Sequence, residues 1–284
     1  MNIIERAIRL STAAAAPDST KAPSAGRARQ APPVAPTLDR SGGEAVSFLG
    51  LAALGLLPDP ERDAQLIEQL RHLKRPILQN AFGPLADGVA NIVMVTSARP
   101  GAGKSFVSAA LAQALTRARE LSVVLIDMDN IKATLTRGLQ LTGRPGFLDA
   151  ADQPGIALES TLVATEVPGL RIIPTGQQTK ESSELLHSAR AAELLHNLSG
   201  DDPTRIIILD CPPLLSTPDA HAILELAHQI VLVVEAGVTK ESEMKQVLES
   251  IGREKPVGLV LNKAVGGLTS LYGGDYYAGA HDAS

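Results

Sequence analysis

A glycine-rich loop followed by a lysine and a serine is the segment of this sequence best suited to chemistry on phosphates. The segment comprises Arg99, Pro100, Gly101, Ala102, Gly103, Lys104, Ser105 and Phe106. In such a loop the backbone N–H groups and the N-terminus of the following helix surround phosphate oxygens. We expect Lys104 to contact the β- and γ-phosphates of a nucleotide and the Ser105 hydroxyl to bind Mg²⁺. Ala98 departs from the motif, which has glycine six positions before the lysine.

Three aspartates stand at the ends of apolar runs, where a metal ion bound to phosphates needs carboxylate ligands. Asp127 and Asp129 end the run 122–129, and Asp210 ends the run 205–210. Ligands of α/β folds bind at the carboxyl ends of strands, and an apolar run ending in aspartate is typical of a Mg²⁺ site. Any one of these aspartates could instead cap a helix, but three of them downstream of one phosphate loop favour the metal site.

The pattern of apolar residues predicts the scaffold that brings these side chains together. Short runs rich in β-branched residues cover 92–97, 122–129, 170–175, 205–210, 229–236 and 256–262. Helical segments between them cover 105–120, 181–198, 218–227 and 240–251. Continuous apolar strands are typical of a parallel sheet that is covered on both faces. We therefore predict an α/β protein with the P-loop NTPase fold, in which helices flank a mostly parallel, doubly wound sheet.

Composition divides the chain into four parts. They are a disordered N-terminal segment (1–45), N-terminal helices for docking and oligomerisation (46–89), the phosphate-binding domain (90–264) and a flexible tail (265–284). The first part is rich in Ala, Pro, Ser and Arg and lacks apolar periodicity, which favours disorder. In the second part we expect a small helix over 46–57 and a longer helix over 61–74 that Pro76 ends or kinks.

Charge and composition narrow the class of protein. The 284 residues include 26 Lys and Arg against 31 Asp and Glu, a net charge of −5, which argues against general nucleic-acid binding. The single cysteine, Cys211, permits no intrachain disulfide, and we interpret it as a small buried residue. No apolar run reaches the roughly 20 residues that cross a bilayer, and the N-terminus has no secretory signal. We therefore expect a cytoplasmic protein.

All the tyrosines of the chain lie in its final 13 residues, as Tyr272, Tyr276 and Tyr277. This asymmetry calls for a reason. A glycine-flanked cluster is flexible enough to enter an active site, whereas the alternative is a weakly ordered tail without a role.

Several stretches together resemble the bacterial tyrosine kinases that regulate exopolysaccharide export. They are the loop over 96–105, the acidic strand LIDMD, the sequence LDCPP, and residues 172–188 and 233–264. Residues 68–82 resemble the helix that precedes the catalytic domain in the cytoplasmic, exosortase-associated subgroup. The resemblance covers about residues 46–278. It implies a protein-tyrosine autokinase that uses ATP and Mg²⁺.

The same resemblance implies roles for individual residues. The catalytic residues would be Lys104, Asp127, Asp129 and Asp210, and the metal ligands Ser105, Asp127 and Asp210. One of Asp127 and Asp129 would assist the loss of the tyrosine proton while the other holds metal, and the sequence does not assign which. Asn262 would contact adenine, the alternative being a turn residue at a strand end. The phosphoacceptors would be the three tail tyrosines.

Oligomerisation and partners are also implied by the resemblance. A tail that carries the substrate favours transfer between subunits of a homo-oligomer. Glu68, Arg71 and Lys74 stand at the E-x-x-R-x-x-R spacing of the helix that mediates ring assembly in the family, although an ordinary solvated face has the same appearance. We expect a separate membrane activator of the chain-length-determinant type, recruitment to the inner face of the membrane and a cognate tyrosine phosphatase.

Three positions depart from the pattern of this family. Ala102 replaces a frequent glutamate, the segment 130–132 lacks the usual arginine, and Arg99 stands where positioning ATPases have a second lysine. Two alternatives therefore stay open. One is a partition- or septum-positioning ATPase that forms no phosphotyrosine, and the other is an ATP-binding scaffold of a polysaccharide-export complex.

Overall fold

The computed structural model describes residues 45–47, 49–53, 55–58, 64–83, 90–118 and 121–264. The predicted N-terminal linker, apart from its last residue, and the tail with Tyr272, Tyr276 and Tyr277 lie outside the described residues. So does the expected start of the longer N-terminal helix. The boundaries of the four predicted parts stay predictions.

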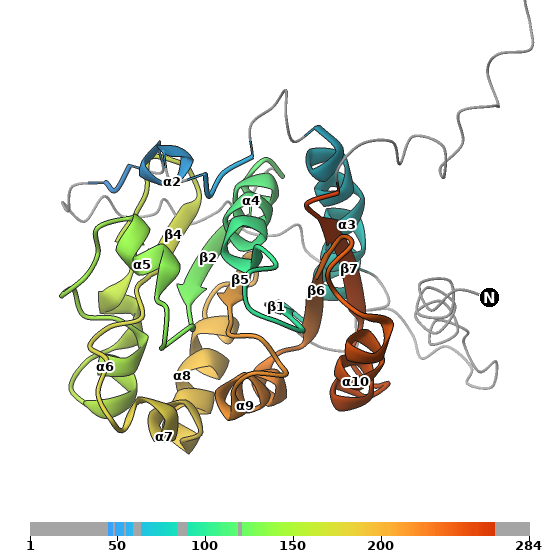
Figure 1. The fold of residues 1–284 in the computed structure, drawn as a ribbon. Helices are drawn as coiled ribbons and strands as arrows, with labels where there is room; N and C mark the ends of the chain where they lie inside the picture. The colour runs from blue at the N-terminus through green and yellow to red at the C-terminus, as the bar shows by residue number, and fades with distance from the viewer. Residues whose placement is uncertain are drawn as a thin grey trace, which may run out of the picture.

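A seven-stranded sheet forms the centre of the described chain (Figure 1). Its strands are β1 (Ile92–Ser97), β2 (Ser122–Asp127), β3 (Val163–Ala164), β4 (Leu170–Ile173), β5 (Arg205–Asp210), β6 (Gln229–Glu235) and β7 (Val257–Asn262). Their order is β3-β4-β2-β5-β1-β6-β7, and all neighbours are parallel except β3 and β4. The predicted parallel sheet is therefore confirmed, and the short antiparallel β3 is an addition to it.

Helices cover both faces of the sheet (Figure 1). One face carries α2 (Leu49–Ala53), α3 (Ala64–Phe82), α4 (Lys104–Thr116) and α5 (Thr134–Gly138). The other carries α6 (Phe147–Asp152), the 3₁₀ helix η1 (Leu158–Thr161), α7 (Ser182–Leu186), α8 (Ala189–Gly200), α9 (Pro218–Leu226) and α10 (Glu241–Ile251). Among the described residues, no helix combines the length and the apolar character needed to cross a bilayer.

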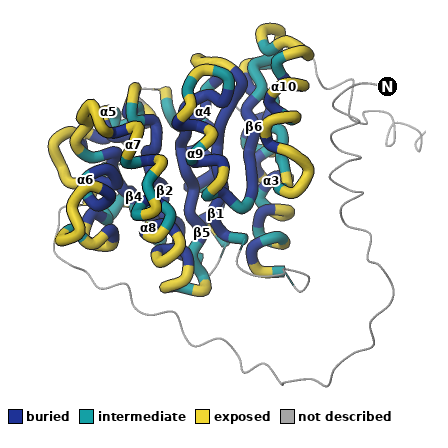
Figure 2. Tube along the Cα trace, turned by 90° about the horizontal axis from the view of Figure 1, so that it is seen from below, coloured by how far each residue is buried: buried dark blue, intermediate teal, exposed yellow. Residues whose placement is uncertain are grey.

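Alternation along the strands explains the two layers. In β1, Val93 and Val95 face the α3 and α4 layer, whereas Ile92 and Met94 face the α8 and α9 layer. Because successive strand residues point to opposite faces, a strand covered on both sides must be apolar throughout. Figure 2 shows the strands as buried segments in the interior of the molecule, with most exposed residues on the helices and loops around them.

Several expected helix boundaries are wrong. The small helix expected over 46–57 is limited to α2, because Val46 pairs with the sheet instead and its backbone N donates to Ala164 O at 2.9 Å. The helix expected over 105–120 is α4, which ends at Thr116.

The helix α3 does not end at Pro76 but continues to Phe82, because its apolar side still meets the sheet through Ile77 and Ala81. Packing of an apolar face thus outweighs the hydrogen bond that proline removes. The segment 181–198 forms the two helices α7 and α8, because Ser188 accepts a hydrogen bond from Ala191 N and begins a new helix.

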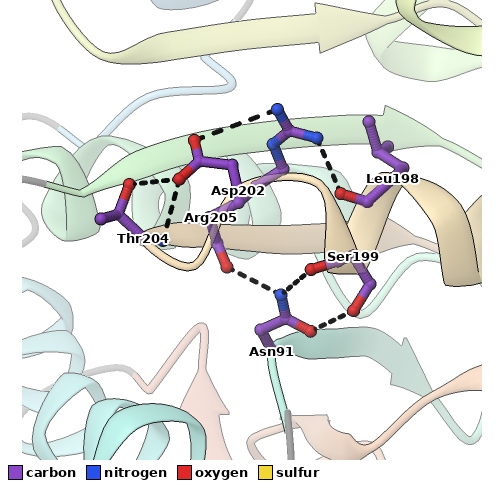
Figure 3. A network of polar contacts seen from close by, with 6 residues as sticks. All are labelled: Asn91, Leu198, Ser199, Asp202, Thr204 and Arg205. Carbon is purple, nitrogen blue, oxygen red and sulfur yellow. Dashed lines mark hydrogen bonds and ion pairs between the residues drawn. The ribbon is translucent and has the colours of Figure 1, made fainter. Parts of the chain in front are cut away.

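A network of buried and partly buried polar groups lies where β1 and β5 begin (Figure 3). The Asn91 amide nitrogen donates to the backbone oxygens of Ser199 (3.0 Å) and Arg205 (2.9 Å). Its side-chain oxygen accepts from the Ser199 hydroxyl at 2.6 Å. Asp202 accepts from both the backbone N and the hydroxyl of Thr204. The opposite edge, where these strands end, carries the residues that the sequence singles out.

Candidate functional site

The glycine-rich loop joins the end of β1 to the start of α4. Gly101 and Gly103 have φ angles of 90° and 93°, in the left-handed region that favours glycine. Gly103 is also the N-cap of α4 and supplies no side-chain hydrogen bond to that helix. The first N–H groups of α4 therefore have no side-chain cap at this N-terminus, which is the arrangement that binds phosphate oxygens.

The last residue of β7, Asn262, and the residue after it, Lys263, hold this loop through side-chain hydrogen bonds. The Asn262 amide nitrogen donates to Ala102 O at 2.8 Å, and a Cβ added to Gly103 would lie 2.2 Å from that nitrogen. Lys263 Nζ donates to Gly101 O at 2.7 Å and pairs with Glu235 Oε1 at 3.0 Å. Adenine contact by Asn262 stays a prediction, since its amide nitrogen binds the loop backbone. Lys263 was not singled out from the sequence, although it neighbours Asn262.

The strand register brings two of the predicted carboxylates together. Asp127 and Asp210 are directly opposite each other at the ends of β2 and β5. Asp210 Oδ1 accepts from the Ser108 hydroxyl at 3.0 Å, whereas its Oδ2 is buried without a hydrogen-bond partner among the described residues. Asp127 Oδ2 accepts from both the backbone N and the hydroxyl of Thr136, each at 2.8 Å. Asp210 Oδ2 is thus buried without a hydrogen bond of normal geometry within the described chain, although the Ser105 hydroxyl lies near enough to the carboxylate to oppose the rise in its pKa.

Asp129 lies beyond the strand end and organises the loop that follows it. Its Oδ1 accepts from the backbone N of Ile131 (3.3 Å) and of Lys132 (2.9 Å). Its own backbone N donates to Asp127 Oδ1 at 3.3 Å. A hydrogen bond therefore joins Asp127, the last residue of β2, to Asp129 in the loop that follows.

Burial dominates the electrostatics of the site. Burial raises the pKa of Asp210 to about 7, and the charge of Asp127 raises it further. Hydrogen bonds from the Ser105 and Ser108 hydroxyls and the charge of Lys104 act in the opposite direction. Burial also raises the pKa of Asp127 to about 6, against the hydrogen bonds from Thr136. Lys104 is only 7% exposed, and burial lowers its pKa although Asp210 and Asp129 act in the opposite direction. These groups resist ionisation when no ligand compensates their charge.

The donor set fits a magnesium ion held jointly with phosphates. The buried Oδ2 of Asp210 is an oxygen ligand without a partner in the described chain, and Ser105 is the second residue of the adjacent helix α4. The described residues contain no cluster of three or more His, Cys, Asp or Glu that could hold a metal by themselves. Mg²⁺ usually binds through one or two carboxylates, waters and substrate phosphates. The donor set therefore suits a Mg²⁺ ion that is bound together with a nucleotide.

Nucleotide binding by Arg99, Pro100 and Phe106 stays a prediction, and these residues differ in their surroundings within the chain. Arg99 Nε pairs with Glu243 Oε1 of α10 at 3.2 Å, and Pro100 is exposed. Phe106 packs against the apolar layer that contains α3 and α4. Cys211 is fully buried, as expected, and burial raises its pKa well above the ordinary value. A buried, protonated thiol is a poor nucleophile.

A second polar cluster beside the site was missed by the sequence analysis. Asp219, buried at the start of α9, accepts from Asn130 Nδ2 at 3.1 Å and from the Ser183 hydroxyl. His187 Nε2 lies 3.7 Å from the same carboxylate. The cluster ties the loop after Asp129 to α7 and α9. No motif marks these residues, because they are far apart in the sequence and meet only in the fold.

The three charged residues at the expected assembly spacing lie on α3. Glu68 and Arg71 are exposed and pair with each other at 3.0 Å. Lys74 differs, since its Nζ donates to Ala114 O at 3.1 Å and is partly buried. Two of the three side chains therefore remain at the surface for contacts outside the chain.

Known proteins resemble both the fold and the loop. Residues 93–273 match the family model CbiA, described as the CobQ/CobB/MinD/ParA nucleotide binding domain. The chain is 31% identical over 191 residues to the putative tyrosine-protein kinase EpsB of Ralstonia nicotianae, covering 66% of this chain and 24% of EpsB. It is 30% identical over 177 residues to the tyrosine-protein kinase CpsD of Streptococcus agalactiae, covering 61% of this chain and 75% of CpsD.

A solved structure agrees with these relatives. The kinase domain of the Escherichia coli tyrosine kinase ETK superposes with a TM-score of 0.58 at 26% identity, covering 71% of this chain and 78% of that domain. The chain spans about a quarter of the length of EpsB and three quarters of the length of CpsD.

Proposed function

This chain belongs to the family of bacterial tyrosine kinases, and we propose that it transfers the γ-phosphoryl group of ATP to tyrosine hydroxyls. One observation supports the proposal. At the carboxyl ends of the central strands, a glycine-rich loop and the buried Lys104 lie near the paired Asp127 and Asp210. Phosphoryl transfer asks a protein mainly for positioning and for neutralisation of charge. These groups supply both.

Each group has a place in binding ATP. The loop from Gly101 to Ser105 and the N-terminus of α4 hold the phosphates, while Lys104 places its charge beside the transferred group. Ser105, Asp127 and Asp210 would hold Mg²⁺, with Asp210 Oδ2 as the available carboxylate oxygen. When bound, Mg²⁺ neutralises phosphate charge and orients the phosphate oxygens.

The proton of the tyrosine hydroxyl needs an acceptor as the oxygen attacks. A free tyrosine has a pKa near 10, so few hydroxyls are ionised at neutral pH. Asp127 and Asp129 are the candidates for this role, and the backbone of Asp129 is already hydrogen-bonded to the Asp127 carboxylate. We propose that one of them accepts the proton while the other contributes to the metal site.

Substrate, assembly and partners form the finer part of the proposal. Tyr272, Tyr276 and Tyr277 are the proposed phosphoacceptors, modified between subunits of a homo-oligomer. The exposed Glu68 and Arg71 on α3 support a role of this helix in assembly, with Lys74 beside them. A membrane activator of the chain-length-determinant type would recruit the kinase to the inner face of the membrane. The process served would be exopolysaccharide polymerisation and export, reversed by a tyrosine phosphatase.

Mass spectrometry tests the proposed activity directly. The purified chain is incubated with ATP and Mg²⁺, beside Lys104→Met and a variant with all three tail tyrosines changed to Phe. We expect phosphate on the tail tyrosines of the unaltered chain and none on Lys104→Met. Steady ADP release without phosphotyrosine would replace this proposal with a positioning-type ATPase. If neither product forms, even with the activator's cytoplasmic peptide, an ATP-binding scaffold becomes the better description.

A further inference from the structure

The helix α3 contacts the outermost strand of the sheet through a paired side-chain amide. Gln69 Nε2 donates to Leu261 O at 3.3 Å, and Leu261 N donates to Gln69 Oε1 at 3.1 Å. Leu261 lies in β7, which is an edge strand, and Figure 1 shows α3 alongside it. One side chain thus satisfies both backbone groups of an edge residue, as a neighbouring strand otherwise would.

Close packing keeps α3 in register with β7. A Cβ added to Gly258 would lie 2.4 Å from Leu73 Cδ1, so glycine leaves room for the helix at this point. Leu66, Leu70 and Leu73 of the same helix are buried in the layer that also contains α4. A shift of α3 along the strand therefore costs apolar packing as well as the two hydrogen bonds of Gln69.

The next residue of β7 connects this contact to the nucleotide loop. Asn262 follows Leu261, is buried and donates to Ala102 O at 2.8 Å. Its amide nitrogen also occupies the space that a side chain at Gly103 would need. Leu261 thus contacts α3 through its backbone, and the following residue, Asn262, contacts the glycine-rich loop through its side chain.

We propose that Gln69 is a positioning residue for the nucleotide loop. It holds Leu261, and through Leu261 the backbone of Asn262, so that the Asn262 amide keeps the loop in the shape that receives phosphates. Glu68, which directly precedes Gln69, and Arg71, two residues after it, lie at the surface of α3. A contact that moves α3 therefore changes the loop, and by linkage nucleotide binding changes the contact. This inference depends on the proposed ATP site only for the nucleotide titration that forms part of its second test.

Asn80, on the same helix, provides a matched control. Asn80 Nδ2 donates to Gln229 Oε1 at 2.9 Å, and Gln229 is the first residue of β6. That contact lies at the edge where the strands begin, opposite the nucleotide loop. Asn80→Ala and Gln69→Ala both remove a side-chain link between α3 and the sheet, but only Gln69→Ala affects the backbone that braces the loop.

Hydrogen exchange of the full chain without nucleotide is the first test. We expect amides of the loop, measured in peptides covering 97–106, to exchange roughly 3- to 10-fold faster in Gln69→Ala, as for the loss of about one net hydrogen bond. In Asn80→Ala the loop is expected to stay unchanged while amides near Gln229 exchange faster. Equal loop exchange in the two variants and the unaltered chain would overturn the proposal. If Gln69→Ala does not fold, Gln69→Glu replaces it, because a carboxylate faces Leu261 O without a donor.

A double-mutant comparison and a nucleotide titration give the second test. If Gln69 acts through Asn262, Gln69→Ala adds nothing to loop exchange in an Asn262→Ala background. The Kd for a fluorescent ATP analogue with Mg²⁺ should rise roughly 3- to 10-fold in Gln69→Ala and stay constant in Asn80→Ala. Additive effects on loop exchange would assign Gln69 a merely structural role. A chain that binds no nucleotide would refute the proposed function, yet the exchange experiment would still decide the role of Gln69.

Discussion

The two ends of the central strands differ in how their buried polar groups are hydrogen-bonded. Where the strands begin, Asn91 is fully buried, and its side-chain amide uses both nitrogen protons and its oxygen in hydrogen bonds within the chain (Figure 3). Where they end, Asp210 is equally buried, but one of its two oxygens has no partner among the described residues. The Asn91 amide is therefore satisfied within the chain and the Asp210 carboxylate is not, although Arg205 Nε, in the same network as Asn91, is also buried without a partner among the described residues.

This difference separates a structural network from a binding site. Buried polar groups normally find partners inside the protein, because an unpaired group costs free energy. Asp127 and Asp210 have raised pKa values, and Lys104 has a lowered one, for the common reason that burial opposes their charged forms. Such a cost is typical of a site whose ligand supplies the missing charge and hydrogen bonds.

The largest expected effect is the loss of phosphoryl transfer in Lys104→Met. We expect phosphotyrosine formation to fall at least about 100-fold, since the variant removes the charge placed beside the transferred group. The folded chain should tolerate the change, because it removes a buried charge. The rate is followed by mass spectrometry, with Lys245→Met on the exposed face of α10 as control. A Lys104→Met chain as active as this control would contradict the assignment of the site.

At the opposite edge, Asn91→Ala should act on stability and spare nucleotide binding. The variant leaves the Ser199 hydroxyl and two backbone oxygens without their partner, so we expect a loss of about 2–4 kcal/mol in the free energy of unfolding. Urea unfolding gives this value, and titration with an ATP analogue gives the Kd at a temperature where the variant is folded. A large change in Kd with unaltered stability would mean that Asn91 acts on nucleotide binding and not on the stability of the fold.

Asp210→Asn should stabilise the nucleotide-free chain at alkaline pH while it impairs catalysis. The pKa of Asp210 is raised to about 7 in the folded state, above the ordinary value near 4 of an unfolded chain. The folded state therefore binds more protons between about pH 4 and 7, and its free energy of unfolding falls as the pH rises through this range. Removing the carboxylate should recover about 1–3 kcal/mol at pH 8 and almost nothing at pH 4.

Urea unfolding across this pH range measures the effect. Asp202→Asn is the matched control at the other edge, where the carboxylate accepts two hydrogen bonds from Thr204, so that variant should lose stability. An Asp210→Asn chain less stable than the unaltered chain at pH 8 would mean that Asp210 is adequately paired without a ligand.

The smallest effects distinguish two serine hydroxyls. Ser108→Ala and Ser199→Ala each remove one hydrogen bond, worth about 1 kcal/mol of unfolding free energy. The Ser108 bond favours the ionised form of Asp210, so its loss should cost more at pH 8.5 than at pH 5.5. The Ser199 bond joins neutral groups and should cost the same at both values. Equal pH dependence of the two variants, measured by urea unfolding, would remove the contrast.

Several features were predictable from local pattern. The strands β1 and β5 were recognised within their observed bounds because their residues are apolar on both faces. The glycine-rich loop was recognised because it requires glycine at left-handed positions between a strand and a helix. For α3 the sequence predicts too short a helix, because proline is a local signal for a helix end. The burial that keeps α3 helical beyond Pro76 depends on a strand that follows more than 150 residues later.

The sequence by itself determined the order of strands and helices along the chain, the phosphate loop and the acids at strand ends, because each depends on residues that are neighbours or are one turn apart. Only the tertiary structure decided which of these groups meet. It placed Asp210 opposite Asp127, the Asn262 amide beneath Gly103 and Gln69 beside Leu261. Such contacts depend on strand order and helix packing, which arise from the burial of the whole apolar surface and leave no local trace in the sequence.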